Sequence, residues 1–174
     1  AQQSLATEVL RNANNMIASD ATAGMFVTLL FGILDGEALT LKYANAGHPP
    51  PLIFKSRDCS YEQEVACGIA LGAREGVSYE EQVLQFGPGD VAVFYTDGVT
   101  EAMNPKGELF GMKRLIAAVS KTCQSPAEEI MARILEEVST FREDREQNDD
   151  ITLIVLKASL KACLLYTSPS PRDS

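Results

Sequence analysis

The sequence has no tryptophan, a single histidine and few basic residues. Its 15 Lys and Arg residues face 24 Asp and Glu residues, which gives a formal net charge of −9. A protein that binds nucleic acid presents a basic face to the phosphate backbone, so this balance argues against a nucleic-acid partner. The acidity is compatible with a metal site lined by carboxylates, and it is equally compatible with a surface that is acidic for solubility.

Long hydrophobic segments are also missing. The longest apolar run, from Met25 to Leu34, is interrupted by Thr28 and Gly32. It is shorter than the roughly 20 residues that a membrane-spanning helix needs. The chain does not open on a basic segment followed by an apolar stretch, as a signal peptide would. We therefore expect no membrane segment in this chain and a cytoplasmic location.

Signatures of covalent catalysis and of zinc binding are scarce. The four cysteines are Cys59, Cys67, Cys123 and Cys163. No two of them have the spacing of a zinc site or a redox motif, and we interpret them as reduced thiols, which suits a cytoplasmic protein. No glycine-rich phosphate loop ending in Lys-Ser/Thr is present. His48 lies in a Pro/Gly loop without an obvious Ser or Cys partner, so we interpret it as structural.

The apolar periodicity predicts an α+β fold. A helix is expected from Ser4, its cap, to about Ser19, followed by a strand over Met25–Leu34 that is buried on both faces. Further strands are expected over residues 38–44, 52–55, 61–65, 79–86, 91–96 and 151–156, with helices beginning near Met112 and at Ser125-Pro126. Because the hairpin strands are separated from the helices in the sequence, we expect antiparallel sheets covered by helices.

The last segment of the chain differs from the rest. Residues 160–174 show no periodicity and end in Ser, Pro, Arg and Asp. We expect a non-native tail there. Residues 1–159 contain no linker that would divide them, so we assign them to one domain.

Acidic residues flank two of the expected strands. Asp97 directly follows the strand 91–96, whereas Asp149 and Asp150 directly precede the strand 151–156. If these strands are antiparallel neighbours, Asp97 and Asp149 meet at one edge of a sheet. Carboxylates held close together repel unless a proton or a cation lies between them, and hard oxygen ligands suit Mg²⁺ or Mn²⁺. The alternative is that Asp-Gly is an ordinary turn and Asn-Asp-Asp the end of a loop.

Six short segments occur in a characteristic series. They are Met25-Phe-Val-Thr-Leu, Tyr43-Ala-Asn-Ala-Gly-His-Pro-Pro, Gly87-Pro-Gly-Asp, Tyr95-Thr-Asp-Gly-Val-Thr-Glu-Ala, Gly107-Glu-Leu-Phe-Gly and Asp149-Asp-Ile-Thr-Leu. In this order, from about Ser4 to Lys157, they resemble the SpoIIE/RsbU branch of the type 2C-like protein phosphatases.

The resemblance implies an αββα sandwich of two antiparallel sheets flanked by helices. It also implies hydrolysis of phosphoserine or phosphothreonine on a bacterial regulatory protein of the anti-sigma-factor antagonist type, by a water activated by two Mn²⁺ or Mg²⁺ ions. By their positions in the motifs, Asp97 and Asp149 resemble metal ligands, and Asp150 is the less suitable acid. An upstream sensor or regulatory domain is implied for the full-length protein.

One family feature is not found in the sequence. Members carry an upstream Asp-x-x-Gly-His-Gly motif whose Asp bridges both metals, so we expect a domain that is incomplete at its N-terminus, with part of the metal site and impaired activity. Two alternatives stay open. One is a pseudophosphatase module that binds a partner without cleaving it. The other is a phosphatase with an aspartyl nucleophile in an Asp-x-Asp motif, where Tyr95 or Val99 replaces one Asp.

Overall fold

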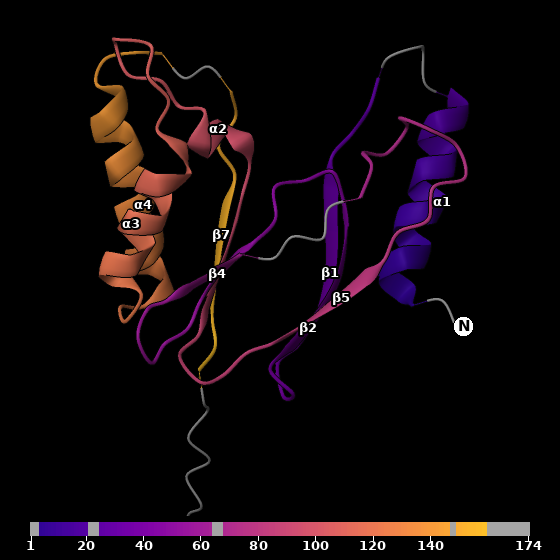
Figure 1. Cartoon of the computed structure of the whole chain (residues 1–174), viewed down its shortest axis with the longest axis horizontal. Coiled ribbons are helices and arrows are strands. Elements are labelled where there is room, and N and C mark those ends of the chain that lie inside the picture. The colour runs from indigo at the N-terminus through magenta and orange to yellow at the C-terminus, as the bar shows by residue number, and fades with distance from the viewer. Residues whose placement is uncertain (1–3, 21–24, 64–67, 147–148, 160–174) are drawn as a thin grey trace, which may run out of the picture.

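The computed structural model describes residues 4–20, 25–63, 68–146 and 149–159 (Figure 1). The elements follow in the order α1 (Leu5–Asp20), β1 (Leu29–Asp35), β2 (Thr40–Ala46), β3 (Leu52–Phe54), β4 (Tyr61–Gln63), β5 (Glu81–Gln85), β6 (Val91–Tyr95), α2 (Asp97–Thr100), α3 (Gly111–Thr122), α4 (Ala127–Arg142) and β7 (Leu153–Lys157). None of the helices in these ranges is both long enough and apolar enough to cross a membrane.

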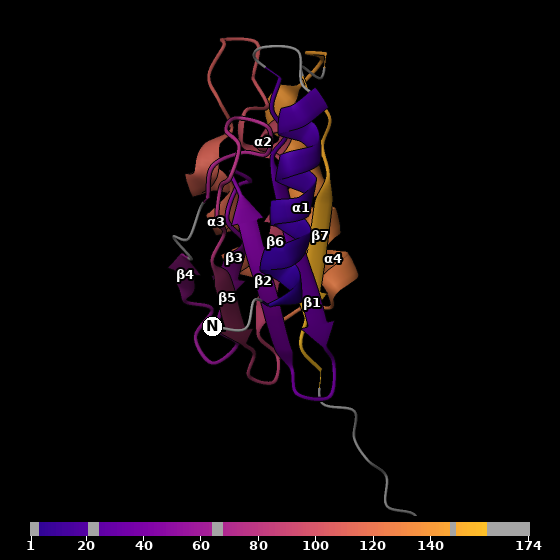
Figure 2. The ribbon, with the colours of Figure 1, turned by 90° about the vertical axis from the view of Figure 1, so that its right-hand side faces the viewer.

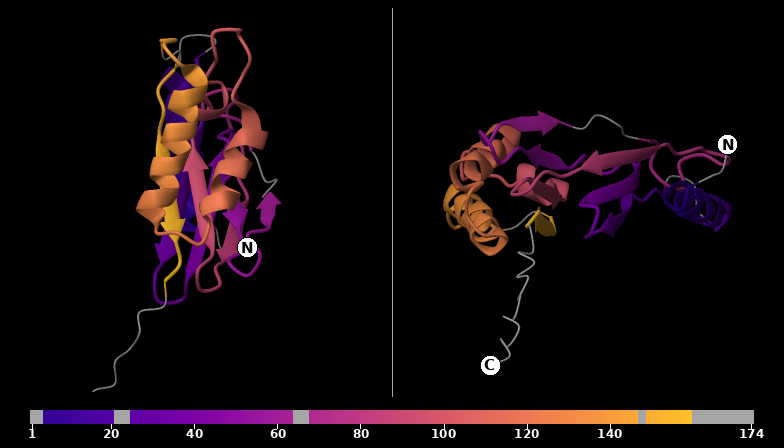
Figure 3. Two further views of the ribbon diagram at one scale, coloured as in Figure 1. Left: turned by 90° about the vertical axis from the view of Figure 1, so that its left-hand side faces the viewer. Right: turned by 90° about the horizontal axis from the view of Figure 1, so that it is seen from below.

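The strands form two antiparallel sheets, and helices cover their outer faces. One sheet has the order β1-β2-β5 and the other the order β4-β3-β6-β7. Helix α1 lies against the first sheet, and α3 and α4 lie against the second (Figures 2 and 3). The predicted α+β class and the αββα arrangement are therefore confirmed.

Three apolar clusters correspond to the interfaces between these layers. The side chains of Leu41 and Tyr43 alternate with polar residues along β2 and pack on Ile53 and Ala92 of the facing sheet. On the opposite face of β2, Ala44 and its neighbours pack on α1. The largest cluster joins β3 and β6 to the apolar stripes of α3 and α4. The periodicity of the sequence correctly places these faces, because burial on one side produces it.

Strand β1 differs from the prediction. It spans Leu29–Asp35 and is not buried on both faces, since the exposed fractions of Ile33 and Leu34 are 39% and 51%. Within the described ranges β1 pairs only with β2, so it lies at the edge of its sheet. An apolar run predicts burial on both faces, but the sequence alone does not reveal what covers each face of the strand.

Two smaller predictions about helix ends have different outcomes. Ser4 caps α1 as expected, because its Oγ accepts the Thr7 backbone N–H at 3.4 Å. The predicted cap of α4 at Ser125 is wrong by one residue. Pro126 occupies the cap position without a side-chain hydrogen bond, and its carbonyl accepts the N–H of Ile130 at 3.1 Å.

The interpretation of all four cysteines as reduced thiols is wrong for two of them. Cys59 and Cys123 form a disulfide, with their Cα atoms 6.0 Å apart. The bond joins the turn between β3 and β4 to the end of α3. Cys67 and Cys163 lie outside the described residues. A pairing between residues 64 positions apart leaves no trace in the spacing of cysteines along the chain.

Candidate functional site

The predicted acidic residues lie where β6 ends and β7 begins. The two strands pair antiparallel, with Tyr95 opposite Leu153. One residue further, the backbone N–H of Thr96 donates to the carbonyl of Thr152 at 3.1 Å. The Thr96 hydroxyl accepts the Thr152 N–H at 2.9 Å and donates to the carbonyl of Asp150 at 3.0 Å. Through these hydrogen bonds Thr96, which follows β6, holds the segment that precedes β7 in place.

Gly98 shows how closely these two segments approach. A Cβ atom added to Gly98 would lie 2.5 Å from the carbonyl oxygen of Asp150 and 3.3 Å from that of Asp149. No other residue fits there without displacing backbone. The Asp-Gly pair is thus more than a turn signal, because the absence of a side chain at Gly98 lets the segment after β6 approach the backbone of Asp149 and Asp150.

All three carboxylic acids of the site are exposed to solvent. Asp97 is the first residue of α2, and its Oδ1 accepts the N–H of Gly98 at 3.1 Å. Asp149 Oδ1 accepts the N–H of Asp150 at 2.8 Å. An ionised carboxylate has about four lone-pair sites on its two oxygens, so these contacts are compatible with binding of a cation.

The residues fit part of a divalent-metal site. Asp97 and Asp149 are hard oxygen donors of the kind that Mg²⁺ and Mn²⁺ prefer. Across the described ranges, no group of three or more His, Cys, Asp or Glu side chains has the arrangement of a metal site. A metal held here would complete its coordination with water, phosphate, backbone oxygens or residues outside those ranges.

His48 lies beside this site, which its sequence context did not indicate. Its Nδ1 is 3.3 Å from the hydroxyl of Thr28, and its ring lies near the backbone of Tyr95 and within electrostatic range of Asp97. Burial lowers the pKa of His48, and the negative charge of Asp97 and the nearby polar backbone of Tyr95 only partly oppose this. The ring is therefore mainly neutral at neutral pH. The one available signal was that its loop leads directly into β3, the neighbour of β6.

The alternative with an aspartyl nucleophile finds no support in the structure. Tyr95 and Val99, the residues at the two positions where that motif needs an Asp, are both buried in the core next to α3 and α4. Burial, with a smaller contribution from Tyr61, raises the pKa of Tyr95 to about 12. Both side chains are thus enclosed by apolar residues, whereas the carboxylates of the site are exposed to solvent.

Comparison with known sequences identifies relatives over most of the chain. Residues 1–159 match the family model described as Stage II sporulation protein E (SpoIIE). Protein IcfG of Synechocystis sp. is 34% identical over 148 residues, which cover 84% of this chain and 23% of that protein. Phosphoserine phosphatase RsbU of Bacillus subtilis is 29% identical over 153 residues, 87% of this chain and 44% of RsbU. The chain thus spans less than half the length of these two relatives.

Solved structures with low sequence identity share the fold. The SiaA-PP2C domain of Pseudomonas aeruginosa is 18% identical and superposes with a TM-score of 0.73, over 87% of this chain and 60% of that one. The phosphatase domain of SpoIIE from Bacillus subtilis, presoaked with Mn, is 20% identical with a TM-score of 0.67, over 99% of this chain and 80% of that one. With the family match over residues 1–159, the chain belongs to the SpoIIE family, as the series of six segments predicted.

Proposed function

We propose that this chain is part of a metal-dependent protein serine/threonine phosphatase. The observation that carries the proposal is the contact between the Asp97-Gly98 segment and the Asp149-Asp150 segment at one end of the second sheet. The family supports it, since the relative RsbU is named a phosphoserine phosphatase. The proposed reaction is hydrolysis of phosphoserine or phosphothreonine on a bacterial regulatory protein.

In this proposal Asp97 and Asp149 are ligands of Mn²⁺ or Mg²⁺, and the complete domain binds two such ions. Asp150 is the less suitable ligand by its position in the motif, where it is the second of the two tandem acids. Divalent ions supply positive charge that lowers the pKa of water and stabilises phosphoryl oxygens. The chain itself holds the two acidic segments close together, through the hydrogen bonds of Thr96 and the absence of a side chain at Gly98. Their carboxylates remain exposed to solvent.

The substrate and the cellular context belong to the same proposal. We propose a phosphorylated protein of the anti-sigma-factor antagonist type as substrate, a cytoplasmic location, and a sensor domain elsewhere in the full-length protein. The relatives IcfG and RsbU extend well beyond the matched region, which covers 23% and 44% of them. A disulfide is uncommon in the cytoplasm. The disulfide does not favour the proposed cytoplasmic location, which therefore rests only on the proposed class of substrate.

A pseudophosphatase module is the second candidate, and one observation favours it. The described residues supply two well-placed carboxylates but no cluster of three metal-binding side chains. A module of this kind would bind the phosphoprotein and release no phosphate. Phosphate release by the full-length protein in the presence of Mn²⁺ separates the two candidates.

The decisive variant is Asp97→Asn in the full-length protein. Since the substitution removes a negatively charged ligand and keeps the shape, we expect Mn²⁺-dependent release of phosphate from a phosphoserine protein to fall by about 100-fold or more. The melting temperature should stay near that of the wild type, because Asp97 is exposed.

Glu101→Gln is the matched control, since Glu101 is an exposed acid four positions further along the same segment. It should keep its activity. Wild-type turnover in Asp97→Asn would refute the assignment of Asp97. A wild-type protein that binds the phosphoprotein and Mn²⁺ without releasing phosphate would instead establish the pseudophosphatase.

A further inference from the structure

The two cysteines of the Cys59–Cys123 disulfide differ in how far solvent reaches them. Cys59 lies in the turn between β3 and β4 and is half-buried, whereas Cys123, at the end of α3, is only 1% exposed. A small thiol opens a disulfide by attack on one of its sulfur atoms, and access decides which sulfur is attacked. The side of this bond that is open to attack is therefore that of Cys59.

The position of Cys123 is fixed by contacts that do not involve its sulfur bond. Cys123 belongs to the apolar cluster between the second sheet and helices α3 and α4. The ammonium group of Lys157, the last residue of β7, donates to the backbone carbonyls of Cys123 and Ser125, both at 2.7 Å. Hydrogen bonds from a charged donor are among the stronger ones in proteins. The end of α3 should therefore keep its place when the disulfide is open.

The turn that carries Cys59 is also held by its own hydrogen bonds. The backbone N–H of Cys59 donates to the Lys55 carbonyl at 2.8 Å, and the N–H of Lys55 donates to the Ser60 carbonyl at 2.9 Å. In the same turn, the N–H of Ser56 donates to the Asp90 carboxylate at 2.9 Å. These bonds connect the turn to the start of β6 without the help of the disulfide.

Gln124 connects the two halves of the pair. It directly follows Cys123, and its side-chain amide nitrogen donates to the carbonyl of Ser56. The same nitrogen lies 3.6 Å from Cys59 Sγ. A hydrogen-bond donor beside a sulfur favours its thiolate, which is the form that attacks when a disulfide closes again. The two sulfur atoms should therefore stay close together, and ready to bond, in the reduced protein.

We propose that Cys59 and Cys123 form a reversible redox site that a small thiol such as glutathione opens at Cys59 while the domain stays folded. The thiolate of glutathione bonds to Cys59 Sγ, the bond between the two cysteines breaks, and Cys123 leaves as a thiolate that takes up a proton. A second glutathione attacks the glutathione sulfur and releases Cys59. Two glutathiones are thereby oxidised to one disulfide, and two cysteines are reduced. Disulfides found in the cytoplasm are mostly of this transient kind.

Two single variants test the difference in access. Both also carry Cys67→Ser and Cys163→Ser, so that each has one thiol. Cys123→Ala leaves the thiol of Cys59, and Cys59→Ala leaves that of Cys123. In the absence of denaturant, we expect the Cys59 thiol to react with the aromatic disulfide dithiodipyridine about 10-fold faster than the Cys123 thiol. Equal rates in two variants that both show a cooperative thermal melt would overturn the proposal.

The second experiment needs no change at either cysteine of the pair. The oxidised chain with the same two serines is incubated with glutathione without denaturant, and the reaction is stopped with N-ethylmaleimide in denaturant. Peptide mapping by mass spectrometry should find glutathione on Cys59 and maleimide on Cys123 about 10-fold more often than the reverse. Equal amounts of glutathione on the two cysteines would contradict attack at Cys59. A bond that opens only at urea concentrations that unfold the chain would contradict a redox site in the folded domain.

Reversibility is the last measurement. The fully reduced chain should give the dispersed amide spectrum of a folded protein in nuclear magnetic resonance, and oxidised glutathione should restore the disulfide without denaturant. A reduced chain with the narrow spectrum of an unfolded protein would show that the bond is a structural requirement of the fold. A folded, reduced chain in which the bond does not form again would equally overturn the proposal.

Discussion

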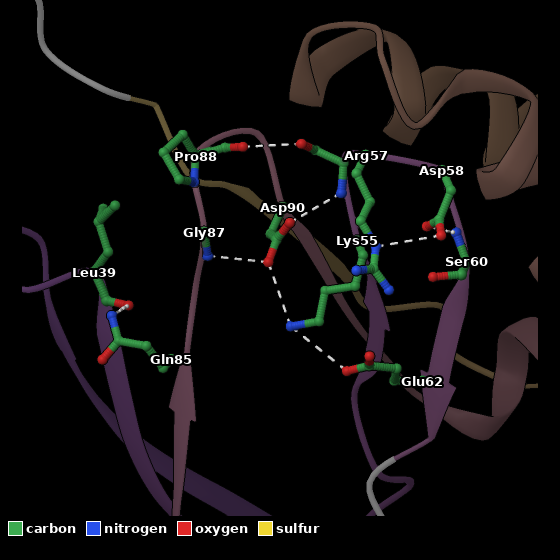
Figure 4. A network of polar contacts seen from close by, with 11 residues as sticks. Leu39, Lys55, Arg57, Asp58, Ser60, Glu62, Gln85, Gly87, Pro88 and Asp90 are labelled. Carbon is green, nitrogen blue, oxygen red and sulfur yellow. Dashed lines mark hydrogen bonds and ion pairs between the residues drawn. The ribbon is translucent and has the colours of Figure 1, made fainter.

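At the scale of single residues, Asp90 is the one charged side chain in the buried set of the described residues. Its carboxylate accepts the backbone N–H of Ser56 at 2.9 Å and that of Gly87 at 3.0 Å, and Lys55 Nζ lies 3.4 Å away (Figure 4). Gly89, with φ of +83°, allows the tight turn beneath it. Asp90 thereby connects the turn before β6 to the hairpin of β3 and β4.

The ionised form of Asp90 should stabilise the fold. Burial alone raises the pKa of Asp90, but the N–H groups of Ser56 and Gly87 and the charge of Lys55 together lower it below its usual range. Because the folded-state pKa is the lower one, this stabilisation is complete above the unfolded-state pKa and is lost as pH falls through the folded-state pKa. Asp90→Asn should lower the free energy of unfolding by about 1–3 kcal/mol at neutral pH.

Urea unfolding of wild type and Asp90→Asn as a function of pH measures this effect. The difference in unfolding free energy should be constant near neutrality and shrink below about pH 4. The side chain of Glu62, the other carboxylate partner of Lys55, is 54% exposed. Glu62→Gln should therefore change stability little. A difference for Asp90→Asn that is zero at neutral pH, or that persists unchanged in acid, would contradict this role.

The residues of the site differ in how far the sequence predicts them. The placement of Asp97 and Asp149 near the ends of neighbouring strands could be predicted, because strand ends are readable from hydrophobic patterns. The place of His48 could not be found, since its contacts to Thr28 and Tyr95 join segments 20 or more residues apart across two sheets. Such contacts leave no periodic signal in one sequence.

At the scale of elements, the disulfide fastens the β3–β4 turn to the α3–α4 junction. Cys123 is 1% exposed in the core, and Gln124 beside it bonds to the carbonyl of Ser56 near Cys59. The bond closes a loop between residues 64 positions apart, which restricts the unfolded chain. Reduction should therefore lower the free energy of unfolding by about 2–4 kcal/mol.

Urea titrations with and without dithiothreitol measure this contribution. Cys123→Ala is the control, because a chain that cannot form the bond should be indifferent to the reductant. Identical unfolding midpoints of the wild type in both conditions would show that the bond contributes nothing to stability.

Element boundaries show the limits of local patterns. The apolar stripes of α3 and α4 appear where predicted, because one face of each packs on the second sheet. Helix α2 was not predicted, since four residues are too few to show a helical period. Strand β1 was predicted to be buried on both faces and is partly exposed, because what covers a strand is a property of the whole fold and not of the strand.

At the scale of the whole molecule, the two sheets present their loops and acidic strand ends in one region. The end of β6, the start of β7 and the loop of His48 converge there, although they come from three distant parts of the sequence. The αββα arrangement followed from the family resemblance, whereas hairpins and helix stripes alone predicted only an α+β fold. The convergence brings acidic segments from two strand ends into contact, and a shared cation would offset the repulsion between their carboxylates.

Anomalous diffraction at the manganese edge, from crystals of this chain soaked in Mn²⁺, tests the central claim most directly. The account predicts a manganese peak within coordination distance of carboxylate oxygens of both Asp97 and Asp149. Manganese found only at other acidic residues, with none bound by either of these two, would contradict it.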